Sequence, residues 1–171
     1  MTDTILQIVH ITVFISIFGV MIALAAIDVK HYILPDVLNA ALGILFLAFH
    51  QLAGWHLISP TQALIGALAG GGMLLAIRCA ANAYYKADTL GLGDVKLMTA
   101  AGLGLGFPDI LMALSLGAMV GLGHGIIMGI NERRRGNKNA SFAKVNVPAG
   151  LGLCVGIAIM FLIAFQMNWL A

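Results

Sequence analysis

Long apolar stretches are the feature that most constrains the fold of this chain. Residues 5–27, 61–81, 109–130 and 147–170 are almost uninterrupted runs of apolar side chains. A helix of about 20 such residues crosses the hydrocarbon core of a bilayer. The chain is 61% hydrophobic and only 9% charged, with a mean hydropathy of +1.00, whereas soluble domains contain about 25% charged residues. The composition therefore predicts a polytopic membrane protein.

Two shorter apolar stretches complete the predicted fold. Residues 37–55 form one of them, and residues 95–107 form the other, which is short for a full span. We expect an all-α bundle of about six transmembrane helices that makes up a single integral-membrane domain over residues 1–171. Glycines in the third and fifth segments are expected to allow close helix packing: Gly66, Gly70, Gly71, Gly72, Gly117, Gly121, Gly125 and Gly129.

Several classes of site are excluded by the polar residues. The two cysteines, Cys79 and Cys154, do not form a CxxC motif, which argues against a structural zinc site or a disulfide framework. The five histidines show no HExxH or other ligand spacing, so a metalloprotease is not expected. We expect no metal and no other cofactor. The net charge of +2 is small, and its cations cluster near membrane edges, which argues against nucleic-acid binding.

The basic residues predict the orientation in the membrane. In the six-helix arrangement all nine lie on one side: Lys30, Arg78, Lys86, Lys96, Arg133, Arg134, Arg135, Lys138 and Lys144. By the positive-inside rule this side is cytoplasmic, so both termini are outside. The run from Arg133 to Lys144 is interpreted as a topology anchor, with substrate binding as the alternative.

Two short polar motifs interrupt the apolar sequence on the predicted cytoplasmic side. The first, DVKHYILPD, begins at Asp28, and its proline favours a turn between two helices. The second, GLGDVK, contains Asp94 as its only acid. Ionisable side chains beside hydrocarbon are costly and usually functional. We therefore predict that Asp28 and Asp94 form a functional pair.

A pair of carboxyl groups at this position suits peptide hydrolysis. Two adjacent carboxyls tend to share one proton near neutrality. The ionised member can take a proton from an attacking water while the protonated member donates to the scissile carbonyl. Gly91 and Gly93 are expected to adopt backbone angles that other residues avoid and to make room for a peptide strand. The alternative is that Asp28 and Asp94 cap helices or pair with neighbouring cations.

Taken together, three motifs resemble the type IV prepilin peptidases, which are intramembrane aspartic proteases of the GxGD group. The motifs are D-x5-LPD with a following asparagine, GxGD-x-K, and K-x3-P-x-G before the last helix. Their residues are Asp28, Leu34, Pro35, Asp36, Asn39, Gly91, Gly93, Asp94, Lys96, Lys144, Pro148 and Gly150. The resemblance implies that Asp28 and Asp94 are the catalytic aspartates and that the other motif residues support them.

The resemblance also implies a substrate and a location. It implies an endopeptidase that cleaves the leader from a prepilin at the cytoplasmic face of the bacterial inner membrane. The prepilin would have a basic leader before the cut and a hydrophobic helix after it, and the bilayer would be the second partner. Larger family members also contain paired CxxC motifs and an N-methyltransferase activity. This sequence lacks those motifs, so we expect cleavage without methylation, as in the short peptidases of tight-adherence (Flp) pilus systems.

Other interpretations remain open at this point. A small proton-coupled transporter would use the two acids as proton carriers, and a non-catalytic pilus assembly factor would use them as helix caps. Asp36 and Asp88 are either contacts for leader cations or solvated loop acids. Lys96 either lies near the two acids or extends to the headgroups. The sequence leaves the oligomeric state open.

Overall fold

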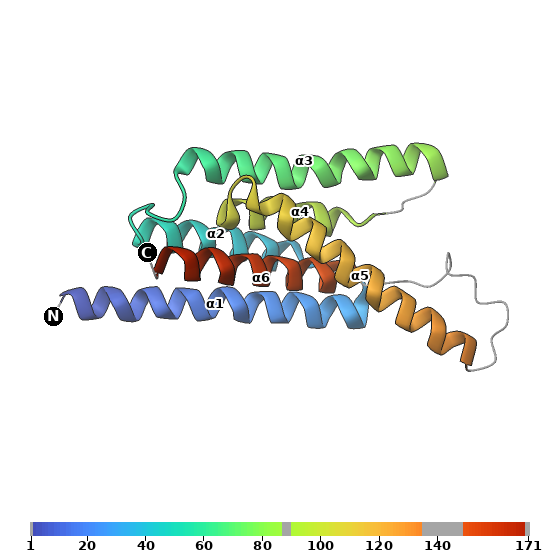
Figure 1. Cartoon of the computed structure of the whole chain (residues 1–171), viewed down its shortest axis with the longest axis horizontal. Coiled ribbons are helices and arrows are strands. Elements are labelled where there is room, and N and C mark those ends of the chain that lie inside the picture. Colours follow the sequence, from blue (N-terminus) through green and yellow to red (C-terminus); the bar gives the residue numbers. More distant parts are fainter. Residues whose placement is uncertain (1, 87–89, 135–148, 170–171) are drawn as a thin grey trace.

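A bundle of helices makes up the fold (Figure 1). A computed structural model describes the backbone of residues 2–86, 90–134 and 149–169 and the side chains of residues 4–86, 90–130 and 149–166. Its elements are α1 (Thr2–His31), α2 (Asp36–Leu52), α3 (Pro60–Tyr85), α4 (Leu92–Leu105), α5 (Asp109–Arg134) and α6 (Ala149–Trp169). The described residues contain no strand, so the predicted all-α bundle of six helices is confirmed.

Four of the helices, α1, α3, α5 and α6, are long and apolar enough to cross a membrane. Helix α2 is also apolar but has 17 residues, and α4 has only 14. The chain is therefore a multi-pass membrane protein in which two of the helices are shorter than a full span.

The short helix α4 lies at the centre of the bundle. It packs against α2, α3, α5 and α6, and most of its residues are buried. Helix α1 contacts α2 and α6, while α5 pairs mainly with α6. At the end of the bundle where α1 begins and α6 ends, aromatic rings fill the core, with Phe161 packed against Phe14, Phe46 and Phe49. Because its neighbours cover α4, this helix fits into the bundle without spanning the full bilayer.

Glycines bring α3 and α4 into backbone contact. A Cβ atom added to Gly66 would lie 2.5 Å from the carbonyl oxygen of Gly102, and one added to Gly70 would lie 2.7 Å from that of Met98. The predicted packing role of these α3 glycines is confirmed. For Gly72 the prediction is wrong, because an added Cβ would meet nothing within 4 Å. Its side of α3 faces away from α4.

A similar contact joins α5 to α6. A Cβ atom added to Gly117 would lie 2.9 Å from the Cα atom of Leu153. Helix α6 supplies glycines in return, since an added Cβ on Gly152 would lie 2.9 Å from the backbone nitrogen of Gly121. The predicted packing role is therefore confirmed at Gly117. At Gly121 it is wrong, because a Cβ atom added there would meet nothing within 4 Å, and the close contact is made by Gly152 of α6.

Two helix bounds differ from the prediction in a way that matters for the acids. Helix α1 continues past residue 27 to His31, so Asp28 lies within a helix and not in a frayed end. Helix α4 begins at Leu92 instead of residue 95, which places Asp94 in its first turn. Charged side chains do not break a helix by themselves, and a cation in the last turn or an acid in the first turn is favourable.

We expect Gly66→Ala to lower the thermal stability of the protein in detergent, because its new methyl group would push α3 from α4. Overpacking of this kind costs about 1–3 kcal/mol. Gly72→Ala is the matched control on the same helix, since its methyl group would enter open space. Equal melting temperatures for the two variants would contradict the backbone contact.

Candidate active site

The turn between α1 and α2 positions the first acid. Helix α1 ends at His31, Tyr32 adopts a left-handed conformation with φ 55°, and Pro35 caps the start of α2. Within this turn the Leu34 side chain is buried. It lies so close to α4 and α6 that a Cβ atom on Gly93 would be 2.8 Å from its Cβ, and one on Gly150 would be 3.0 Å from its Cδ1. The turn, α4 and α6 therefore meet around Leu34.

Asp28 is held at the amino-terminal end of α6. Its carboxyl oxygen Oδ2 accepts a hydrogen bond of 3.0 Å from the backbone N–H of Leu151, and the backbone of Gly150 also donates to this carboxylate. A Cβ atom on Gly150 would lie 2.9 Å from Cγ of Asp28. The first N–H groups of a helix have no partner within it, so a carboxylate suits this position. Asp28 is only 5% exposed.

Asp94 has a comparable setting at the start of α4. It is 7% exposed, and the backbone of Gly91 donates a hydrogen bond to its carboxylate. The predicted unusual backbone at Gly91 is wrong, because its φ of −66° and ψ of 137° are open to any residue. A Cβ atom there would instead lie 3.1 Å from Oδ2 of Asp94. Gly93 lies within α4 and makes room for the chain's own Leu34.

Both acids open onto one pocket of about 360 Å³, which we call the aspartate pocket. The two carboxylates come from α1 and α4 and are close enough to interact electrostatically. Seven of the residues singled out from the sequence line this pocket: Asp28, Leu34, Asp36, Gly91, Gly93, Asp94 and Lys96. The remaining lining residues are Tyr32, Ile33 and Leu92. The structure thus brings together two acids that are far apart in the sequence.

Lys96 and Asp36 form an ion pair at the edge of the aspartate pocket. Their side chains are 50% and 67% exposed. An exposed pair of this kind contributes about 0–1 kcal/mol to stability. The lysine ammonium is therefore bound to a carboxylate other than Asp28 and Asp94, and Asp36 is not a free loop acid.

Asn39 contributes to the site in a way that the sequence did not indicate. Its Nδ2 donates a hydrogen bond of 3.2 Å to the carbonyl oxygen of Gly93, so α2 is tied to the turn of α4 that contains Asp94. The side chain is 2% exposed. The signal that could have indicated it is the presence of a polar residue at a core-facing position of an apolar helix. From the sequence, Asn39 is identified only as a residue of the first motif.

The remaining motif residues have different positions. Pro35 is the cap of α2 and Gly150 contacts Asp28. Asp88, Lys144, Pro148 and the side chains from Arg133 onward in the basic run lie outside the described residues. Their predicted roles therefore stay predictions.

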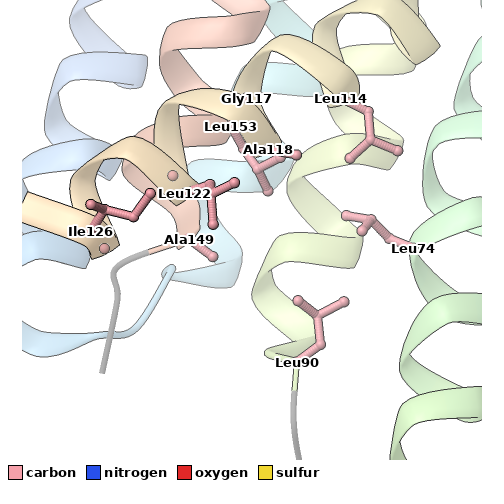
Figure 2. Close-up of a pocket in the computed structure, with 11 residues that line it drawn as sticks. Leu74, Leu90, Leu114, Gly117, Ala118, Leu122, Ile126, Ala149 and Leu153 are labelled. Carbon is pink, nitrogen blue, oxygen red and sulfur yellow. The ribbon is translucent and has the colours of Figure 1, made fainter. Parts of the chain in front are cut away.

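A second pocket, of about 450 Å³, lies among α3, α5, α6 and Leu90, which precedes α4 (Figure 2). Leu90, Ala149 and Leu153 line it near the aspartate pocket, and Leu122 and Ile126 line it on α5. None of its lining residues is ionisable. We call it the α5 pocket, and it offers no group for acid–base chemistry.

Comparison with known proteins shows the family of this chain. The model of the type IV leader peptidase family matches residues 15–126, a range that contains both Asp28 and Asp94. No solved structure shows a significant match.

Curated relatives have the name prepilin leader peptidase/N-methyltransferase. The protein from Escherichia coli is 33% identical over 117 residues, which are 68% of this chain and 51% of the relative. The protein from Dickeya chrysanthemi is 38% identical over 105 residues, 58% of this chain and 35% of the relative. The protein from Legionella pneumophila is 32% identical over 163 residues, 88% of this chain and 50% of the relative.

The chain thus spans about half or less of the length of these relatives. The family model nevertheless covers most of the chain. By this match and by its similarity to the relatives, the chain belongs to the type IV leader peptidase family.

Proposed function

We propose that this protein is a membrane aspartic endopeptidase that removes the leader peptide from type IV prepilins, with Asp28 and Asp94 as its catalytic pair. The observation that supports this most directly is the aspartate pocket, where two buried carboxylates from different helices share one opening. The proposal of a prepilin as the substrate is based on the names of the relatives. The described residues from α1 to α6 would form one peptidase unit.

The proposed chemistry uses the two carboxyl groups as base and acid. One aspartate, ionised, takes a proton from a water molecule as its oxygen attacks the scissile carbonyl carbon. The other, protonated, donates to the carbonyl oxygen, and the tetrahedral intermediate then collapses as the C–N bond breaks and the amine takes up a proton. Burial of both side chains favours this division, because two charged carboxylates in a poorly solvated pocket repel each other.

We also propose that the aspartate pocket lies at the cytoplasmic face of the bacterial inner membrane, with both termini outside. Lys30 and Lys86 lie at the ends of α1 and α3, and Lys96 lies in the first turns of α4. These helix ends lie on the same side of the bundle, opposite the start of α1 and the end of α6 (Figure 1). Basic residues at one end support a cytoplasmic assignment for that end. A Flp-type prepilin is the proposed substrate.

We expect Asp28→Asn and Asp94→Asn each to abolish cleavage of a co-expressed Flp-type prepilin, measured as a mobility shift in membranes at equal enzyme abundance. Loss of one acid from an acid–base pair costs at least about 100-fold in rate. Mass spectrometry of the product from the unmodified protein would locate the cut and show whether the new amino group is methylated.

The same variants test the structural alternative. The hydrogen bonds from Leu151 to Asp28 and from Gly91 to Asp94 are those of helix caps, which favours a non-catalytic assembly factor as the second candidate. Asparagine retains a side-chain oxygen that can accept these bonds, so folding is expected to survive. Cleavage by both variants would therefore support the cap role and contradict the catalytic one.

We expect Gly150→Ala to lower the turnover number by about 10- to 100-fold, because its methyl group would displace the Asp28 carboxylate. Small errors in the position of a reacting group have effects of this size. Gly123→Ala is the matched control, since a Cβ atom there would meet nothing within 4 Å. Similar rates for the two variants would show that the contact between Gly150 and Asp28 does not set the position of the acid.

A further inference from the structure

A groove of about 370 Å³ lies along α2 and α4, on the far side of the Lys96–Asp36 ion pair from the two aspartates. We call it the α2–α4 groove. The ion pair lines both this groove and the aspartate pocket, so the two are adjacent. On α2 the lining residues recur at helical spacing: Asp36, Asn39, Ala40, Gly43, Ile44 and Leu47. They follow one face of α2 for about 16 Å at 1.5 Å per residue.

The two helices that form the groove run in the same direction. Asn39 bonds to Gly93 near the start of both helices, and His50 bonds to the carbonyl oxygen of Gly104 near their ends, at 2.8 Å. The backbones of α2 and α3 do not approach each other within the described part of the chain, and both helices pack on α4. Helix α4 therefore forms a floor beside α2, and the groove leads from the aspartate pocket along the bundle.

The walls of the groove suit an apolar helix. Beyond the ion pair, its side chains are apolar except for Asn39 and Thr99. Ala40 is small and exposed, and Ile44 is 67% exposed beside it. Small residues allow two helix backbones to approach closely within a membrane.

Asn39 supplies a polar feature at the end of the groove nearest the aspartates. Its Nδ2 is bonded to Gly93, but its Oδ1 is buried and has no hydrogen-bond partner among the described residues. A buried acceptor without a partner costs about 1–3 kcal/mol. The first four N–H groups of a helix are donors without an intrahelical partner. Asn39 lines the groove, so a helix that starts beside it would bring such donors next to this acceptor, and a small shift of the amide would complete the bond. A lipid acyl chain has no donor.

We propose that the α2–α4 groove binds the first turns of the hydrophobic helix that follows the scissile bond of the prepilin. This inference rests on the proposed function and assigns the part of the enzyme that holds the substrate helix. The scissile bond then lies at the aspartate pocket, and the amino-terminal turn of the bound helix lies at Asn39. The α5 pocket is the competing site within the same chain, and it is apolar throughout.

Site-specific photocrosslinking tests the assignment. A benzophenone amino acid replaces Ile44 in the groove, Leu122 in the α5 pocket, or Leu68 on α3, three side chains that are each 67% exposed. Each variant is combined with Asp94→Asn and co-expressed with the prepilin. We expect crosslinking to the prepilin at Ile44 to exceed that at the other two positions by about tenfold. Preferential crosslinking at Leu122, equal crosslinking at all three, or crosslinking at Ile44 only to a second copy of this chain would overturn the proposal.

Cleavage by the unmodified protein is measured in parallel, which separates the groove assignment from the proposed peptidase function. A prepilin that is cleaved but does not crosslink at Ile44 overturns the groove assignment and leaves the peptidase function in place. A prepilin that the unmodified protein does not cleave overturns the proposed function, and the groove assignment with it.

A groove-filling substitution gives a second readout. We expect Ala40→Phe to lower the yield of the Ile44 crosslink and the rate of prepilin cleavage by about tenfold, because its ring would occupy the space of the substrate helix. Ala76→Phe on α3 is the matched control, since Ala76 is also exposed and lines neither the groove nor the α5 pocket. Equal crosslinking and cleavage by these two variants would overturn the proposal.

Discussion

The close packing of Leu34 against two glycines is the contact on which the site depends. Leu34 is supplied by the turn after α1, Gly93 by α4 and Gly150 by α6, and a side chain on either glycine would collide with the leucine. Asp28 precedes this turn, Asp94 follows Gly93, and the N–H group that binds Asp28 follows Gly150. The packing of Leu34 therefore holds together the end of α1 and the starts of α4 and α6. This brings Asp28 and Asp94 to the same pocket.

The short helix α4 begins at the pocket, only two residues before Asp94. Its glycines bring α3 into backbone contact, so the helix is covered although it does not span a bilayer. Van der Waals packing replaces the hydrophobic effect between helices in a membrane, which is why such contacts rely on small residues.

The polar side chains around the aspartate pocket have two kinds of partner. Some pair with each other or with the backbone and support the site, and within the described part of the chain the two aspartates bind only backbone donors. Lys96 is paired with Asp36, and the Asn39 amide nitrogen with Gly93. Asp28 and Asp94 each accept a backbone N–H at a helix start and line the same pocket. Among the described residues these two acids are held by backbone donors, an arrangement suited to groups that exchange protons with a substrate.

The sequence by itself determined the all-α class, the number of helices and the two acids worth pairing, because apolar run length and the cost of a charge beside hydrocarbon are local properties. It did not determine why the glycines are where they are. Gly91 and Gly93 were expected to have unusual backbone angles, but their backbones are ordinary and their lack of a side chain accommodates Asp94 and Leu34. Likewise, only the tertiary structure revealed the bond from Asn39 to Gly93 and the groove beside it. Such contacts join segments distant in the chain, so their partners depend on how the helices pack, which the local pattern of the sequence does not specify.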